Sequence, residues 1–406
     1  MNTKIESSNL LVFTRFLYAS DESFLTMLTC IISKQREKSL FWFGEWISSV
    51  ELETAKQEIW KIYYDFYAIV YPKMEKYIQK KLNSTSKQSC VKKSILIIGG
   101  IIKNFIIRDA DCTVFLLRQK MLNDSLKPKV YRGRRPSWIK DFDKSFQALL
   151  FSLHKQNINN VCYFLKNTEQ SVNDIHTQVV TYYKDVEKQQ INMDLARSKW
   201  NENSYNDKKH LLLAIVCFMN RDEADIKLKK MFVSLTEKEN DLVLNPERYL
   251  RHEDECDGAG EGGVESEKNP DAPYKKLEKN RLFPIDPIIG SFSLQRWRQA
   301  KPINNLLWEH WEYFAYMSPI WKTRFQKFGE KYDIEHDKMK IVFADDPEHD
   351  KFEAFTEKYN YEPDEQSTEV QEKSTLEIQP QPRNTWLTKL FDIEKEKQQV
   401  NKQFVW

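Results

Sequence analysis

Between residues 20 and 77 the chain places apolar side chains at helical spacing in three or four consecutive stretches, separated by very short joints. The first stretch follows Ser20, a residue type that caps helices, and opens with Asp21 and Glu22, whose charges suit a first turn. Its apolar positions are Phe24, Leu25, Leu28, Ile31 and Ile32. Positions three and four apart share one face of a helix, so this pattern predicts amphipathic helices packed on one another.

The next stretches continue the pattern. A second helix is predicted from Leu40, Phe43, Trp46 and Ile47. Ser49 is expected to cap a third helix, whose apolar stripe is Leu52, Ala55, Ile59, Ile62, Tyr63 and Phe66. Pro72 is expected to start a fourth, because proline suits the first helical turn.

The isoleucine-rich run 94–109 allows two interpretations. Gly99-Gly100 between apolar flanks is typical of a tight β-hairpin, whereas the spacing of Ile98, Ile102 and Phe105 fits a buried helix. We favour the helix because its neighbours are helical. The chain also has only 10 glycines, too few for the many positive-φ turns of a hairpin-rich protein.

A second helical block is predicted from Phe142 onward. It includes a long amphipathic stretch over 171–200, an apolar helix over 211–219 and a partner helix over 222–235. A fixed shift along the chain lays Lys34-Gln35 on Lys155-Gln156, and a slightly smaller shift lays Tyr63-Tyr64 on Tyr182-Tyr183. Either the first 240 or so residues are stacked helical hairpins of the solenoid kind, or they form one irregular helical domain.

The predicted fold class is therefore all-α: stacked amphipathic helical hairpins, solenoid-like or irregular, with a smaller aromatic-rich helical part near the C-terminus. Acidic residues and glycines dominate 252–271, which cannot bury enough apolar surface to fold. The predicted parts are a first helical block (1–125), a second after a basic connector (126–250), a disordered acidic linker (251–280), an aromatic-rich helical segment (281–345) and a charged tail with a short terminal helix (346–406).

No sequence pattern indicates catalysis. The chain lacks the P-loop motif GxxxxGK[ST], the GxSxG motif and paired metal-binding histidines. His252 and Cys256 lie in the acidic linker, and the acids around Asp345-Asp346 are typical of a solvated turn. The six cysteines are too far apart for a local zinc site and are expected to be reduced thiols. We therefore expect no catalytic residues, no bound metal, no cofactor and no enzymatic activity.

The basic connector is the candidate site for a charged partner. Its cations and aromatic residue are Lys127, Lys129, Arg132, Arg134, Arg135, Trp138 and Lys140. Arginines beside aromatic rings can bind phosphates and stack on bases, which indicates contact with nucleic acid. The alternative is a solvated loop whose charges pair with the acidic linker or with nearby carboxylates.

The aromatic band over 283–328 is the candidate site for a protein partner. The predicted docking residues are Trp297, Trp308, Trp311, Tyr316 and Trp321. Aromatic residues at this density either fill a core or supply the centre of an interface, and the sequence leaves both interpretations open.

The N-terminus does not have the pattern of a secretory signal, and the longest apolar run is too short for a membrane span. Two regions, Phe41 to Tyr67 and Phe352 to Ser367, resemble uncharacterised α-helical proteins of giant nucleocytoplasmic DNA viruses. The resemblance implies a virus-encoded protein that is not secreted and acts in the host cytoplasm or the viral factory, or is packaged in the virion.

These observations favour a non-enzymatic helical scaffold or adaptor that mediates protein–protein interaction. The alternative is a nucleic-acid-associated factor in viral replication or gene expression that uses the basic connector 127–140. An enzyme whose site is assembled from distant residues is the least favoured hypothesis. The sequence does not identify the partner, the oligomeric state or the stage of infection.

Overall fold

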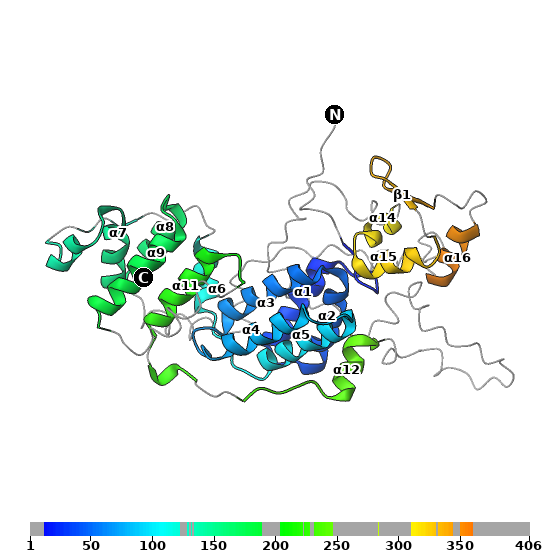
Figure 1. Ribbon diagram of the computed structural model, residues 1–406, viewed down its shortest axis with the longest axis horizontal. Helices are drawn as coiled ribbons and strands as arrows, with labels where there is room; N and C mark the ends of the chain where they lie inside the picture. The colour runs from blue at the N-terminus through cyan, green and yellow to red at the C-terminus, as the bar shows by residue number, and fades with distance from the viewer. Residues whose placement is uncertain are drawn as a thin grey trace. The chain divides into compact units, whose positions relative to one another are not determined.

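The computed structural model of this 406-residue chain describes residues 12–121, 128–129, 131, 134–188, 204–221, 223–227, 231–246, 283, 310–329, 332–343 and 350–359. These residues form fourteen α-helices, two short 3-10 helices and one two-stranded sheet (Figure 1). The all-α fold class is therefore confirmed. Within the described ranges, no helix has both the length and the apolar character needed to cross a membrane.

The chain groups into two compact units, each assembled from separate stretches of sequence. Unit 1 comprises Met1–Ala55, Ser89–Ile107 and Val233–Trp386, and unit 2 comprises Lys56–Gln88, Arg108–Phe232 and Leu387–Trp406. The boundary predicted between residues 125 and 126 falls inside unit 2, because helices distant in sequence pack together. The predicted acidic linker 251–280 lies outside the described residues.

The core of unit 1 is a helical hairpin covered by two further helices. The hairpin consists of α1 (Ser20–Ile32) and α2 (Arg36–Ser49), and both of its helices pack against α5 (Val91–Ile106). A short helix, α12 (Glu237–Leu244), packs against α2 and α5 (Figure 1). The isoleucine-rich run is thus helical, as favoured above. A Cβ at Gly99 would lie 2.8 Å from Leu235 and 3.2 Å from Phe43, so the missing side chain allows close packing there.

The two predicted serine caps are wrong. Ser20 is the first residue of α1 and Ser49 is the last residue of α2, and neither caps a helix through its side chain. Their hydroxyls lie 2.7 Å apart and share a hydrogen bond in the core. The local patterns around each serine could not show that two hydroxyls distant in sequence would pair.

The helix predicted over 222–235 is also wrong. Only Glu223–Asp225 forms a 3-10 turn, and residues 231–236 carry no helix. The buried amide of Asn104 donates to the Val233 carbonyl at 2.8 Å and accepts from its N–H at 3.1 Å. Because this side chain satisfies the backbone of the strand-like segment, the segment needs no helical hydrogen bonds there.

Three charged side chains then fix α12. The Glu239 carboxylate accepts from Lys103 at 2.7 Å and also pairs with Arg36. Thr236 and Glu239 form a capping box at the start of the helix. Burial alone would raise the pKa of Glu239, but the hydrogen bonds from Arg36, Lys103 and Thr236 lower it to about 2.

The remainder of unit 1 contains the helices expected in the aromatic-rich segment, together with a β-hairpin and a further helix that the sequence did not predict. The elements are α14 (Trp311–Tyr316), α15 (Pro319–Gln326), β1 (Tyr332–Glu335), β2 (Lys340–Phe343) and α16 (Asp350–Tyr359). Pro319 begins α15 as predicted. The strands are antiparallel, with Tyr332 opposite Phe343 and Glu335 opposite Lys340. The hairpin turn contains no glycine, and Met339 takes the positive φ instead, so the usual hairpin signal is missing.

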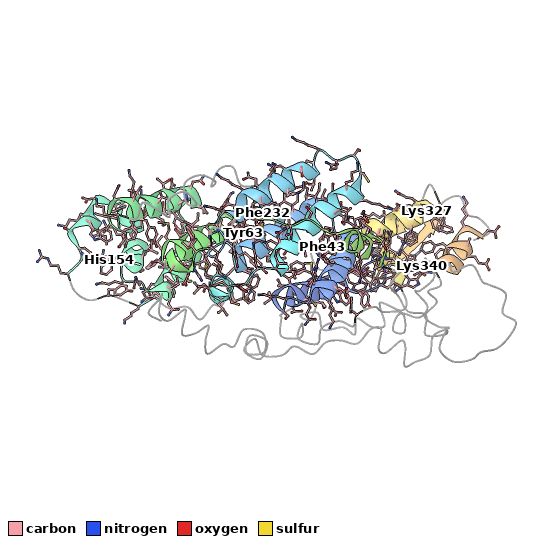
Figure 2. All side chains as sticks on the ribbon, turned by 90° about the horizontal axis from the view of Figure 1, so that it is seen from below. Phe43, Tyr63, His154, Phe232, Lys327 and Lys340 are labelled. Carbon is pink, nitrogen blue, oxygen red and sulfur yellow. The ribbon has the colours of Figure 1, made fainter. Side chains whose placement is uncertain are left out.

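Unit 2 contains most of α3 (Leu52–Phe66) together with α4 (Met74–Thr85), α6 (Thr113–Met121), η2 (Ser137–Asp141), α7 (Lys144–His154), α8 (Ile158–Asn167), α9 (Val172–Asp185), α11 (Lys208–Met219) and η3 (Glu223–Asp225). The helix α7 packs against α8 and α9, and α11 packs against α6, α8 and α9 (Figure 1). Tyr77 stacks on Phe232 with centroids 4.0 Å apart, and the guanidinium of Arg108 lies over the Phe232 ring (Figure 2 labels Phe232).

The same helix–turn–helix occurs once in each unit. Between α1 and α2, the N–H groups of Ser33, Lys34 and Gln35 donate to Thr29, Ile31 and Cys30. Between α7 and α8, the N–H groups of Lys155, Gln156 and Asn157 donate to Phe151, Leu153 and Ser152. Lys34 and Gln156 hold equivalent positions, with φ of 59° and 50°. Both turns are therefore Schellman motifs. The backbone matches Lys34 with Gln156, one residue away from the sequence alignment, which laid Lys34 on Lys155.

The next helices also match. Tyr63 and Tyr64 of α3 are buried with centroids 5.0 Å apart, and Tyr182 and Tyr183 of α9 are buried with centroids 5.2 Å apart. The Tyr63 carbonyl accepts from residues 67 and 68, and the Tyr182 carbonyl accepts from residues 186 and 187. The match is local, because α7 packs against α9 whereas α1 and α2 belong to unit 1 and most of α3 to unit 2, so the repeat and the irregular arrangement both stay open.

Gln156 offers a test of the turn geometry. A left-handed residue at the end of a helix favours glycine, because glycine has no Cβ to clash with the backbone. We expect Gln156→Gly to raise the free energy of unfolding by about 0.5–1 kcal/mol, measured by urea denaturation. Gln156→Ala is the matched control and should give no gain. A glycine variant less stable than the native chain would contradict the assigned conformation.

Candidate nucleic-acid interface

The basic connector lies in unit 2 on the surface formed by α7, α8 and α9. The structure describes Lys129, Tyr131 and the residues from Arg134 onward, while Lys127 and Arg132 lie outside the described residues. Residues 137–141 form the 3-10 helix η2, which packs against α7. The connector therefore has a defined path at these positions.

A buried asparagine fixes the start of this path. Asn160 of α8 is 1% exposed, and its side-chain oxygen accepts from the backbone N–H of Lys129 at 2.7 Å. Its side-chain nitrogen donates to the carbonyl of the same residue at 2.9 Å. One amide thus satisfies both backbone groups of Lys129, as a neighbouring β-strand would. Sequence reasoning missed this residue, because nothing near Asn160 in the sequence marks it as a partner of the connector.

Aromatic contacts fix the rest of the path. The Tyr131 ring meets Phe151 of α7 edge to face, with centroids 5.1 Å apart. The Trp138 ring lies 5.4 Å from His154 and 5.3 Å from Tyr182, centroid to centroid (Figure 2 labels His154). Ile139, in the next position, is 3% exposed. The apolar side chains of the connector therefore point into unit 2 and hold its backbone in place.

The cations of the connector point the other way. Lys129, Arg134, Arg135 and Lys140 are all exposed, and we call these four residues the basic surface. Within the described part of the chain, none of them has a carboxylate within ion-pair distance. The alternative in which nearby carboxylates neutralise these charges is therefore not supported by the residues that the structure describes.

Asp141, directly after Lys140, is exposed, and two further carboxylates near the connector make contacts within unit 2. Asp143 caps α7 by accepting from the backbone N–H of Ser145 at 2.8 Å. Glu187 accepts from the hydroxyl of Tyr182 and lies 3.3 Å from Nδ1 of His154. Asp143 and Glu187 thus bond to other groups, and Arg134 and Arg135 have no carboxylate partner among the described residues.

A buried ionic cluster in unit 2 was not predicted. Asp65 of α3 is 3% exposed and accepts two hydrogen bonds from Arg118 of α6, at 2.8 and 2.7 Å. His210 of α11 places Nε2 3.1 Å from the same carboxylate, and its Nδ1 shares a hydrogen bond of 2.7 Å with Tyr205. Burial raises the pKa of Asp65, but the charges of His210 and Arg118 outweigh it and hold that pKa well below its usual range.

This cluster ties three helices together. Asp65, Arg118 and His210 come from distant parts of the sequence and are enclosed by packed rings, including Tyr64. Fork-shaped arginine–carboxylate pairing is strong when buried, and removing one partner leaves an uncompensated charge. We interpret the cluster as a structural contact and not as a reaction centre.

A shallow depression of about 430 Å³ lies near α9 and α11, lined by Val172, Asn173, Asn206, Asp207, Lys208 and Lys209. Two of its polar residues already make contacts within the protein. Asp207 caps α11 by accepting from the His210 N–H at 2.9 Å, and the Lys209 ammonium donates to the Lys166 carbonyl at 3.4 Å. The depression is wide and open, and its lining does not define a reaction.

In the described ranges, no three His, Cys, Asp or Glu side chains are grouped so that they could hold a metal ion. The sequence candidates His252, Cys256 and Asp345-Asp346 lie outside those ranges. The absence of a metal therefore stays a prediction for the chain as a whole.

The aromatic band is placed in the core of unit 1 wherever the structure describes it. Trp311 is 2% exposed and Trp321 is 0% exposed, and the indole of Trp321 donates to the Thr14 carbonyl at 2.8 Å. Tyr316 is half-buried against Phe325 and Tyr332. Trp297 and Trp308 lie outside the described residues. Burial of Trp311 and Trp321 corrects their assignment as docking residues, since they fill the interior.

In comparisons with known proteins, no family model matches this chain, and no curated protein or solved structure matches it significantly. Inference about function therefore depends on the geometry described above.

The Asp65 cluster gives a prediction about stability and pH. Its folded pKa is depressed, so its contribution is complete above the unfolded pKa of about 3.9 and is lost as the pH falls below it. We expect Asp65→Asn to lower the free energy of unfolding by about 3 kcal/mol at neutral pH. The difference in the free energy of unfolding between this variant and the native chain should decrease as the pH is lowered towards 3, measured by denaturation curves. A difference in the free energy of unfolding that stays constant between pH 7 and pH 3 would contradict this account.

Cys90 gives a prediction about thiol reactivity. It is exposed at the N-cap of α5, whereas Cys30, Cys112, Cys162 and Cys217 are buried. The backbone N–H groups of Lys93 and Lys92 lower the pKa of the Cys90 thiol. We expect iodoacetamide to modify Cys90 before these four buried cysteines, with a rate midpoint below the usual pH of about 8.5, measured by peptide mass spectrometry. Equal rates at Cys90 and Cys217 would show that the assigned exposure is wrong.

Proposed function

We propose that this chain is a non-enzymatic helical binding protein that contacts the phosphate groups of nucleic acid through the basic surface. The observation that carries the proposal is the combination of four exposed cations, which pair with no carboxylate among the described residues, with a backbone that the protein itself fixes in place. A cation held on a fixed backbone loses less conformational freedom on binding than one on a mobile loop. Neutralising phosphates also releases the counterions condensed on the nucleic acid.

This order of hypotheses differs from the one that the sequence favours. The protein-docking hypothesis rested on aromatic residues of the band, and the two tryptophans described there are buried. The nucleic-acid hypothesis rested on the cations of the connector, and the four described there are exposed. The resemblance to proteins of giant DNA viruses implies action inside an infected cell, and a role in viral replication or gene expression is part of the proposal.

A protein–protein adaptor is the second candidate. The observation that favours it is the helical hairpin with the same Schellman turn in both units. Repeated helical hairpins are the building units of proteins that present extended surfaces to other chains. Recovery of one stoichiometric protein partner, with no affinity for nucleic acid, would favour this candidate over the first.

The first candidate is tested by removing charge from the basic surface. We expect the double variant Arg134→Gln, Arg135→Gln to bind a mixed-sequence nucleic acid about 10–100-fold more weakly in 0.1 M salt, measured by fluorescence anisotropy. Both side chains are exposed and unpaired among the described residues, so the fold should be unaffected.

The matched control removes two adjacent exposed cations from unit 1, through Lys92→Gln and Lys93→Gln. This variant has the same net charge as the first and should bind like the native chain. Equal loss in both variants would mean that only overall charge matters. Absence of nucleic-acid binding in 50 mM salt, or binding of polyglutamate instead, would contradict the proposed function.

A further inference from the structure

The chemistry that the basic surface offers also restricts which form of nucleic acid it fits. Proteins that bind single strands combine a basic groove with aromatic rings on which the bases stack. The connector has two such rings, Tyr131 and Trp138, and both are already packed against α7 or α9. Both rings are half-buried by these contacts, unlike the exposed rings on which single-strand binders stack bases.

No other aromatic ring takes this role in the described part of the chain. The exposed large hydrophobic side chains there are Val91, Ile107, Met231 and Val342, and none of them is aromatic. Tyr163 and Phe164 of α8 are half-buried and pack against each other, with centroids 5.5 Å apart. Base stacking therefore has no evident platform near the basic surface.

The cations also do not lie on a secondary-structure element of the kind that contacts base edges. Direct reading in the major groove uses an α-helix or a two-stranded ribbon that enters the groove. Lys129, Arg134 and Arg135 lie outside helices, and Lys140 lies in the five-residue 3-10 helix Ser137–Asp141 on the face of α7. Contacts from this surface are thus contacts to phosphates.

We infer that the basic surface binds the phosphate backbone of a nucleic-acid duplex, without preference for base sequence and in preference to a single strand. This inference rests on the proposed function and adds the class of ligand. A duplex carries twice the phosphate charge of a single strand per unit length, so it offers more to a surface that relies on charge alone. Four phosphate contacts predict a slope of about −3.6 for log affinity against log salt, or about 150-fold weaker binding between 50 and 200 mM.

The experiment compares ligands on the full native chain. Two labelled duplexes of about 20 base pairs, one rich in A·T and one rich in G·C, are titrated beside a thymidine single strand of the same length. Binding is measured by anisotropy at 50 and 200 mM salt. We expect the two duplexes to bind within about threefold of each other and at least tenfold more tightly than the single strand, with the salt dependence given above.

A conservative variant separates phosphate contact from base reading. Arg134→Lys with Arg135→Lys keeps both charges but loses the forked donors that pair with guanine. We expect this variant to retain native affinity within about threefold on both duplexes. Three results would overturn the inference and leave the proposed function intact. They are tighter binding of the single strand, a preference for one duplex, and loss of such a preference in the lysine variant. Failure of every nucleic acid to bind would overturn both.

Discussion

Burial of aromatic side chains between short helical hairpins is the interaction on which the rest of this structure depends. Trp42 in unit 1, Trp60 in unit 2 and Trp321 in unit 1 are among the largest side chains that are fully buried. Large rings remove much apolar surface from water, which lets helices of only 6–16 residues form stable packed units. The Schellman turns keep consecutive helices close, so that the rings of one helix meet those of the next.

Charged groups inside such a core must be paired, and this requirement explains most of the ionic clusters. Asp65 with Arg118, Glu239 with Lys103, and Glu45 with Arg15 each join elements that are distant in sequence. Burying an unpaired charge would cost roughly several kcal/mol. Each pair therefore fixes which segments pack together. The same clusters are therefore poor candidates for chemistry. The four cations of the basic surface differ from them, because they are exposed and have no described partner.

The sequence predicts the helices well and their partners poorly. Apolar spacing correctly indicated α1, α2, α3 and α5, because a helix buries one stripe and the stripe is visible in the sequence. It could not indicate that Ser20 and Ser49 bond to each other, or that Asn104 would hold residue 233 in place of a helix. Those outcomes depend on contacts between residues far apart in the chain. The hairpin of β1 and β2 was missed because its turn has no glycine.

At the candidate site, too, the sequence indicates single segments but not the contacts between them. Charge spacing indicated the connector, and four of its cations are exposed. Burial favours the core interpretation for Trp311 and Trp321. The feature that makes the connector a fixed surface is Asn160, whose role depends on the fold of α8 against the chain at Lys129. Composition alone could not distinguish a fixed basic surface from a solvated loop.

The central claim is that this fixed basic surface contacts nucleic acid, and lysine footprinting tests it most directly. The chain is acetylated with and without a saturating duplex, and modification of individual lysines is measured by mass spectrometry. The account predicts that the duplex protects Lys129 and Lys140, while Lys92 and Lys93, equally exposed in unit 1, stay reactive. Protection of Lys92 and Lys93 with Lys129 and Lys140 still reactive would contradict it.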